Sequence, residues 1–414
     1  MRSSLKRMLN RVAAHMGYDR LGDAYRRFMW VYLSMTSAGM IAGAYFSVFL
    51  LRATGSDMAL MYYNLLLALV QPFVMGIAVF TLRRFSVISS QRIGFVLLLF
   101  AYVLLTFRID RIESVVYPVS VLMSSGNAFF FTSYTPMMLR YTTDENRDAA
   151  SGALSFLATL LSLIIPVATG FFISSFGDLR GYRVLFALSS LLCALTIGLS
   201  FRLAPVPGFG RERRAQFRTT LRGMRSSRLM MMAMLNTMLN AVITTAPAYF
   251  GTLIVMDLIG RESLIGLVAF LGGIISMVAS AMYGRMVAPG NRAKWMAIGV
   301  GVILTAIGGM IAKLSVATFV LYSAAAAFAT IFIGTPPVTS YLSVLQRNPA
   351  LRENGPEVHT IREIFYGGGR ALGLVPVFFF RDAREIAVYM ILAVYAVQAL
   401  SVLLTWRIGK NIET

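Results

Sequence analysis

The chain has 414 residues, of which 57% are hydrophobic and 14% are charged, and its formal net charge is +20. A soluble domain carries about 25% charged residues, so this composition excludes a soluble globular protein and predicts a polytopic membrane protein. The basic residues lie in short clusters between apolar runs, a pattern that argues against nucleic acid as a partner and for contact with anionic lipid. With one cysteine and two histidines, we expect no disulfide, no metal site and no cofactor.

The first segment, residues 1–27, is rich in Lys and Arg and is expected on the cytoplasmic side. Apolar residues recur at helical spacing among these charges, for example Leu5, Met8, Leu9, Val12 and Met16. Two interpretations stay open: a basic amphipathic helix lying on the membrane surface, or a solvated basic tail.

Twelve apolar runs follow, each long enough to cross a bilayer with some tilt. They are placed near 28–51, 58–82, 93–107, 115–139, 150–176, 182–201, 229–256, 263–284, 295–312, 314–345, 359–380 and 385–406. A basic stretch rich in Pro and Gly divides them, which predicts an N-terminal six-helix bundle at 28–201, a cytoplasmic linker at 202–228, a C-terminal six-helix bundle at 229–406 and a cytoplasmic tail at 407–414. TSYTPMMLRY at 132–141 resembles TSYLSVLQRN at 339–348, half a chain length later, as expected of a duplication.

The distribution of charge predicts orientation. Most of the 38 Lys and Arg residues fall in segments that are interior if the N-terminus is interior, so both termini are expected in the cytoplasm. Trp30, Trp295 and Trp406 all fall at predicted cytoplasmic helix ends, where an interfacial aromatic belt belongs. We expect a multi-pass monomer in the cytoplasmic (plasma) membrane, in contact with anionic lipid at its cytoplasmic face.

Twelve spans in a 6+6 arrangement, a basic central loop and interior termini resemble the major facilitator superfamily of secondary transporters, from about residue 28 to 406. The resemblance implies an all-α integral membrane fold, two six-helix bundles related by a pseudo-twofold repeat, and transport by alternating access. In this family the loop after span two usually reads G-x-x-x-D-R-x-G-R. Here Gly76 is followed by IAVFTLRR, so Arg83 and Arg84 remain but Phe80 occupies the acidic position.

Two further stretches carry the same resemblance. The loop after span eight keeps Gly284 and Arg285, again without an acid. In span five, Pro166 precedes Gly170 by four residues, which is similar to the proline–glycine motif of the exporter branch. The resemblance therefore implies gating or loop roles for Arg83, Arg84, Arg285, Pro166 and Gly170, and it favours export.

The strongest candidate site lies in span eleven. His359, Glu363, Tyr366 and Arg370 are spaced by four, three and four residues, so they form one stripe on a helix. An arginine near the bilayer centre costs about 2.5–3.5 kcal/mol on insertion scales, and such a residue usually faces a partner or a wet cavity. The three glycines at 367–369 leave room for close backbone approach.

This stripe predicts a mechanism. Arg370 has a planar, permanently charged fork that suits a carboxylate or phosphate. Glu363 is the expected proton acceptor, because a partly buried carboxyl group can exchange a proton near neutral pH. The alternative is that Arg362, Glu363 and Arg370 form a network that only holds span eleven to its neighbours.

The other polar residues of the spans are candidate substrate contacts beside Arg370 and Tyr366. They are Asn64, Gln71, Asn127, Asn236 and Asn240. Intramembrane Asn and Gln also serve as interhelical hydrogen-bond donors and acceptors, worth roughly 0.6–2 kcal/mol each, and that interpretation stays open for each of them.

Together these features predict a secondary active transporter, and not an enzyme, for a small anionic, zwitterionic or amphipathic solute. We expect coupling to protons and a direction of export. A lipid or lipid-linked flippase on the same fold is the first alternative, and a membrane sensor or scaffold that transports nothing is the second. No catalytic triad, metal motif or phosphate loop occurs in the sequence, which excludes the common hydrolytic and ATP-driven chemistries.

Overall fold

The computed structural model describes residues 22–142, 147–176, 178–206, 216–349, 351, 354–379 and 386–413, and every regular element in these ranges is helical. Eleven helices in the described ranges are long and apolar enough to cross a membrane. Most of the predicted amphipathic segment at 1–27 falls on residues 1–21, outside the described residues, and from Asp23 on the chain already belongs to the first crossing helix.

The first half of the chain contains six crossings. They are α2 (Asp23–Gly43) with α3 (Phe46–Thr54), α4 (Asp57–Arg84), α5 (Val87–Phe107), α6 (Ile112–Tyr141, after the short η2 at Ile109–Arg111), α7 (Arg147–Ser174) and α8 (Arg180–Ser200). The first crossing is interrupted at Ala44 and Tyr45, where the sequence predicts one continuous span. Tyr45 makes contacts outside its own bundle, described below.

The second half begins with a short helix that does not cross the membrane, α9 (Phe217–Ser226). The crossings that follow are α10 (Arg228–Leu258), α11 (Glu262–Met286), α12 (Arg292–Ala312, after η3 at Pro289–Asn291), α13 (Val316–Gln346), α15 (Gly355–Leu372, extended by η4 at Val375–Phe378) and α16 (Ala387–Glu413). Of these, α15 alone is not among the eleven apolar helices, because it carries the predicted charged stripe.

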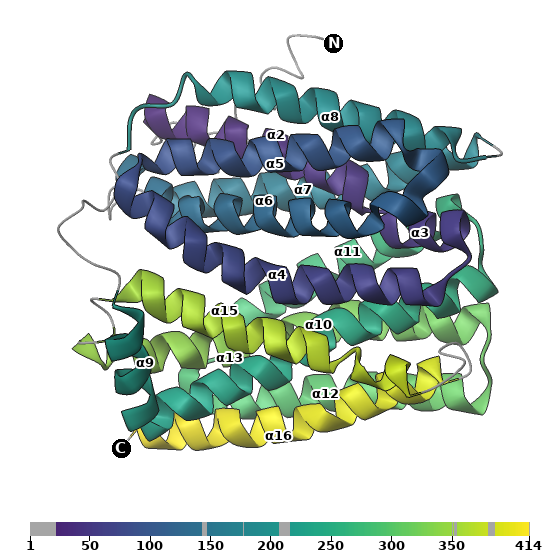
Figure 1. Cartoon of the computed structure of the whole chain (residues 1–414). Coiled ribbons are helices and arrows are strands. Elements are labelled where there is room, and N and C mark those ends of the chain that lie inside the picture. The colour runs from purple at the N-terminus through teal and green to yellow at the C-terminus, as the bar shows by residue number, and fades with distance from the viewer. Residues whose placement is uncertain are drawn as a thin grey trace, which may run out of the picture.

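The crossings form two six-helix bundles, as the sequence predicts. Figure 1 shows α2 to α8 in one half of the molecule and α10, α12, α13, α15 and α16 in the other, with α11 between them. The main contacts between the halves are α4 with α15 and α7 with α11. These two helix pairs position the candidate site.

Four of the described helices start at a serine cap. Ser56, Ser86, Ser227 and Ser315 each accept a hydrogen bond from a backbone N–H in the first turn of the following helix, which satisfies one of the free donors there. The cap at Ser86 starts α5 six residues before the predicted span at 93. Arg92 in the second turn is accommodated because it donates to both the hydroxyl and the carbonyl oxygen of Ser200 at 3.0 Å.

Two consecutive prolines, Pro336 and Pro337, lie inside α13, which nevertheless runs unbroken from Val316 to Gln346. Pro337 has no N–H to donate to the carbonyl of Ile333 one turn earlier. The side-chain amide of Asn240 on α10 donates to that carbonyl instead, at 3.1 Å. A buried acceptor is thereby satisfied across helices.

Candidate functional site

Helix α15 lies between α4 of the first bundle and α10 of the second, and two of its three consecutive glycines face these neighbours. A Cβ added to Gly367 would overlap the carbonyl oxygen of Ala68 on α4, and one added to Gly369 would overlap the carbonyl of Met238 on α10. Gly368 has nothing within 4 Å of the same position. The close backbone approach that the glycine run predicts is therefore present on two sides of the helix.

The contact with α4 depends on a proline as well as on a glycine. Pro72 lies inside α4 and cannot donate a hydrogen bond to the carbonyl of Ala68, four residues earlier. That carbonyl is the group that Gly367 approaches, so a Cα–H of the glycine can partly replace the missing donor. At the α4–α15 interface, Gly367 therefore packs against Ala68 and Pro72.

Arg370, one residue beyond the glycines, bridges the two bundles. Its Nη1 donates to Oε1 of Gln71 on α4 at 3.2 Å, and its Nε donates to Oγ1 of Thr245 on α10 at 3.3 Å. Both partners are neutral, and in the described part of the chain no carboxylate lies within ion-pairing distance of Arg370. A half-buried guanidinium held this way has a positive charge that its protein partners do not neutralise.

Glu363 lies nearly two turns before Arg370 and pairs with a different arginine. Its Oε1 is 3.1 Å from Nη1 of Arg362, and the side chains of this pair are 15% and 12% exposed. The Arg362 guanidinium also lies 5.2 Å from the ring centre of Tyr341 and 5.9 Å from that of Tyr366. Glu363 and Tyr366 of the predicted stripe therefore interact with Arg362, whereas Arg370 makes separate contacts.

The remaining predicted substrate contacts lie in different surroundings. Asn236 donates to the Thr405 hydroxyl at 2.9 Å and accepts from Ser401, and Asn240 caps the Ile333 carbonyl, so both hydrogen-bond inside the second bundle. Asn64 donates to the Leu60 carbonyl of its own helix at 2.9 Å. Asn127 is half-buried on α6. Of this group, Gln71 is the residue that hydrogen-bonds to Arg370.

The predicted gating residues Pro166 and Gly170 lie where α7 crosses α11. The Tyr45 hydroxyl donates to the Pro166 carbonyl at 2.9 Å and lies 3.0 Å from the backbone carbonyl of Glu262. A Cβ at Gly170 would overlap both the Tyr45 hydroxyl and that Glu262 carbonyl. On the loop side, Arg84 is exposed and lies over the ring of Phe85.

The other two predicted loop residues, Arg83 and Arg285, belong to α4 and α11, and their side chains lie outside the described part of the structure.

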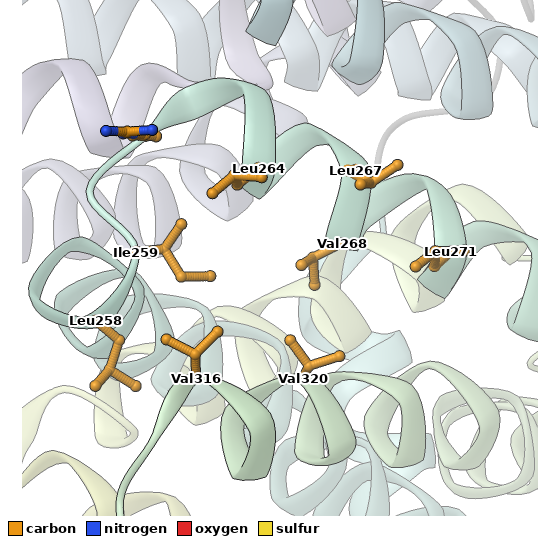
Figure 2. Close-up of a pocket in the computed structure, with 9 residues that line it drawn as sticks. Leu258, Ile259, Leu264, Leu267, Val268, Leu271, Val316 and Val320 are labelled. Carbon is orange, nitrogen blue, oxygen red and sulfur yellow. The ribbon is translucent and has the colours of Figure 1, made fainter.

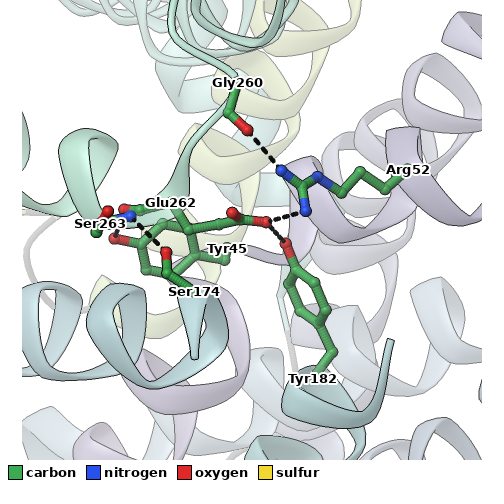
Figure 3. Close-up of polar contacts among 7 residues, drawn as sticks. All are labelled: Tyr45, Arg52, Ser174, Tyr182, Gly260, Glu262 and Ser263. Atoms are coloured by element: carbon green, nitrogen blue, oxygen red, sulfur yellow. Dashed lines mark hydrogen bonds and ion pairs between the residues drawn. The ribbon is translucent and has the colours of Figure 1, made fainter. Parts of the chain in front are cut away.

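A second polar site joins the bundles at the start of α11, and we call it the Glu262 cluster. Figure 3 shows its members: Tyr45, Arg52, Ser174, Tyr182, Gly260, Glu262 and Ser263. The Glu262 carboxylate, in a residue only 3% exposed, is 2.8 Å from Nη1 of Arg52 and accepts a 2.6 Å hydrogen bond from the Tyr182 hydroxyl. Arg52 also donates to the Gly260 carbonyl, and the Ser263 N–H donates to the Ser174 hydroxyl at 3.0 Å.

The cluster was not predicted, because in the sequence Arg52 and Glu262 are ordinary charges at span ends more than two hundred residues apart. One signal was present: Glu262 is an acid at the first position of a span, where it faces both the helix dipole and any cation at the neighbouring helix ends. Thr245 was missed for a simpler reason, since a threonine inside an apolar helix usually bonds its own backbone.

The glycine contacts lead to a testable difference between neighbouring residues. Gly367→Ala places a methyl group against the Ala68 carbonyl, so we expect it to lower stability by about 1–3 kcal/mol, the usual cost of overpacking. Gly368→Ala meets open space and is expected to be neutral or to stabilise the helix by up to ~1 kcal/mol. Thermal unfolding of the purified variants in detergent measures both, and equal midpoints for the two variants would contradict this account of the α4–α15 contact.

Comparison with known proteins agrees with this architecture. The family model described as Major Facilitator Superfamily matches residues 28–374. Among curated proteins, the uncharacterised protein YqgE of Bacillus subtilis (strain 168) is 21% identical over 337 residues, which are 81% of this chain and 77% of that protein.

Solved structures share the fold at low sequence identity. A bacterial homologue of the iron transporter ferroportin, in its inward-facing state, has a TM-score of 0.67 at 13% identity and covers 93% of this chain and 98% of its own. The fucose:proton symporter of E. coli has a TM-score of 0.63 at 14% identity, with coverage of 93% and 99%. Family and fold together indicate a multi-pass membrane transporter rather than an enzyme, and the chain belongs to the Major Facilitator Superfamily.

Proposed function

We propose that the chain is a secondary active transporter that moves a small anionic, zwitterionic or amphipathic solute by alternating access, coupled to protons and directed outward. The observation that carries the proposal is Arg370. Its guanidinium lies between the two bundles and hydrogen-bonds to neutral partners on each, Gln71 and Thr245. A bound carboxylate or phosphate would supply the negative charge that these partners lack, with a geometry that suits two parallel N–H donors.

The position of Arg370 supports a binding role over a purely structural one. A residue that only joins two helices gains most when its charge is compensated, because an uncompensated charge in a low-dielectric region costs free energy. The two hydrogen bonds to Arg370, at 3.2 and 3.3 Å, are long for charge-assisted bonds, which are usually 2.7–2.9 Å. An anionic solute could therefore replace Gln71 and Thr245 as the hydrogen-bond acceptor of Arg370 at little cost in free energy.

Glu363 is proposed to carry the coupled proton. Protonation would remove the charge that holds Arg362 at 3.1 Å and free this guanidinium, which lies over the rings of Tyr341 and Tyr366. Tyr341 belongs to α13 and Tyr366 to α15, so a proton on Glu363 would change the packing between two helices of the second bundle. The fucose:proton symporter, which shares the fold, is by its description a proton-coupled protein.

The Glu262 cluster is proposed to be the exterior gate. With both termini in the cytoplasm, the start of α11 lies at the exterior face, and the cluster closes the bundles against each other there. Release of a solute outward then requires the Arg52–Glu262 pair and the Tyr45 contacts to separate. Pro166 and Gly170 would act in this gate, because they form the surface of α7 on which Tyr45 and the first turn of α11 rest.

The helix in the linker supports the proposed orientation and lipid contact. One face of α9 packs on the second bundle through Phe217, Leu221 and Met224, while Arg218, Arg222 and Arg225 are exposed. Such a helix fits the surface of the anionic cytoplasmic leaflet. A monomer in the plasma membrane, with the linker and both termini inside, is the arrangement we propose.

The function is tested with purified protein reconstituted in liposomes. A panel of anionic, zwitterionic and amphipathic solutes is screened for thermal stabilisation, and each stabilising solute is then assayed for flux with and without a pH gradient. Solute flux driven by the gradient supports the proposal. Movement of a fluorescent phospholipid without solute flux would indicate the flippase instead, and binding without movement of either would indicate a sensor or scaffold.

Replacement of Glu363 separates coupling from binding. Glu363→Gln keeps the shape and one acceptor but cannot ionise, so we expect solute binding to persist while flux no longer responds to the pH gradient. A pH-sensitive dye inside the liposomes reports whether protons move with the solute. Glu113→Gln, an exposed carboxylate on α6, is the control, and retained proton movement in Glu363→Gln would exclude this residue as the proton carrier.

A further inference from the structure

An apolar groove of about 460 Å³ lies on the outer surface of the second bundle, between α11, the end of α10 and the start of α13. Figure 2 shows the side chains that line it, including Leu264, Leu267, Val268 and Leu271 from α11 and Val316 and Val320 from α13. The four α11 residues follow each other at helical spacing, so they form one stripe down the helix. The volume falls within the roughly 300–1,000 Å³ of typical ligand pockets.

The groove faces the lipid rather than the interior of the bundles. Leu264, Leu267 and Leu271 are each nearly half exposed on a helix long and apolar enough to cross the membrane. The stripe from residue 264 to 271 covers about 10 Å along the helix axis, which is less than the ~15 Å of hydrocarbon in one leaflet. A solute in water does not reach such a surface, but an acyl chain of the adjacent leaflet does.

A positive charge lies at one end of the groove. Arg261, the N-cap residue of α11, lines the groove and is exposed, and no side-chain partner for it occurs in the described part of the chain. Lys313, also exposed, lies three residues before Val316 at the same end of α13. The groove therefore combines an apolar channel with a cationic entrance at the helix ends, where phospholipid head groups lie.

We propose that this groove binds one glycerophospholipid, with an acyl chain along Leu264–Leu271 and the phosphate at Arg261. Arginine pairs with phosphate through two N–H donors. A bound acyl chain would cover the apolar lining of the groove, which otherwise contacts disordered lipid. The site is independent of the solute site at Arg370, which lies on the other interface between the bundles. It adjoins the Glu262 cluster, because Arg261 and Glu262 are consecutive and point to different surroundings.

Native mass spectrometry of the delipidated full chain with added palmitoyl-oleoyl phosphatidylglycerol tests the proposal. We expect wild type to retain one lipid at activation energies that strip the others. Arg261→Ala, which removes the phosphate contact, and Val268→Trp, which fills the groove, should each reduce this adduct at least threefold, while Arg261→Lys should keep most of it. Arg108→Ala and Leu191→Trp are matched controls, an exposed arginine and an exposed leucine on the first bundle, and should bind like wild type.

The outcomes separate the alternatives. Equal binding by all variants would overturn the site and leave only general contact with the bilayer. Loss in Val268→Trp without loss in Arg261→Ala would overturn the assignment of the phosphate. A change from dimer to monomer in either variant would show that a second copy of the chain occupies the groove. Each variant is first checked for an unchanged elution profile and thermal midpoint, so loss of lipid is not confused with loss of fold.

Discussion

Replacing Arg370 by alanine is expected to abolish solute-induced stabilisation and to lower transport by about thirtyfold or more. Truncating one partner of a buried charged contact costs ~2–5 kcal/mol, and every 1.4 kcal/mol is a factor of ten in affinity. The loss should be large because the protein partners of Arg370 are the neutral Gln71 and Thr245, so the solute supplies the compensating charge. Isothermal titration and flux in liposomes measure binding and transport separately.

Graded replacements make this prediction specific. Arg370→Lys keeps the charge but loses the planar fork, and we expect weaker binding of the same solutes. Gln71→Ala and Thr245→Ala remove neutral contacts and should change affinity by less than tenfold. Arg92→Ala is the control, because Arg92 is another arginine inside a crossing helix, and it bonds to Ser200 within the first bundle.

Two results would contradict a binding role for Arg370. If Arg370→Ala binds solute like wild type, the arginine only joins α15 to α4 and α10. If Arg370→Ala unfolds while Arg370→Lys folds and binds solute as tightly as wild type, the planar fork is not recognised by the solute and the contact of Arg370 is structural. A folded Arg370→Ala that loses binding, beside an Arg92→Ala that keeps it, supports the proposal.

Replacing Glu262 by alanine is expected to separate the bundles at the start of α11 in a large fraction of molecules. Losing one partner of a fully buried ion pair costs about 3–5 kcal/mol, and the cost here is smaller because the Arg52 side chain is 38% exposed. Even about 1.4 kcal/mol shifts the equilibrium between two states tenfold. The Tyr182 hydroxyl loses its acceptor at the same time, which adds to the effect.

The separation is measured as a distance between the bundles. Spin labels are introduced at positions 108 and 313, which are exposed and lie on different bundles, in a Cys193→Ser background. Pulsed electron paramagnetic resonance then measures the distribution of distances between the two labels. We expect a longer distance to appear in Glu262→Ala and to be rarer in Glu262→Gln, which keeps an acceptor for Tyr182. Glu113→Ala, an exposed carboxylate on the first bundle, is the control.

A double-mutant cycle isolates the pair itself. Arg52→Ala, Glu262→Ala and the double variant are compared by the same distance measurement and by thermal unfolding. If the two single effects add without coupling, the Arg52–Glu262 pair does not hold the bundles together, and the contacts of Tyr45 and Ser174 must do so. A coupling of about 1 kcal/mol or more supports the proposed gate.

The sequence by itself determined the membrane class, the number of crossings and the stripe on α15. The apolar runs are long and separated by segments rich in Arg, Pro and Gly, so hydropathy places most of the crossings, although α5 begins six residues before the predicted span. The bundle division followed from the basic linker and from the echo of residues 132–141 at 339–348. The glycine run predicted close packing because no other residue permits it.

Only the tertiary structure decided which polar groups meet. Spacing places Arg370 and Glu363 on one stripe of a helix, but the hydrogen bonds of Arg370 are to Gln71 and Thr245 on two other helices, and Glu363 pairs with its neighbour Arg362. The Glu262 cluster joins residues from both halves of the chain. Spacing along one helix fixes which side chains share a face, whereas a hydrogen bond between helices depends on how the helices cross. Those crossings are set by small residues and prolines such as Gly170, Gly367 and Pro72, whose neighbours no single-chain pattern identifies.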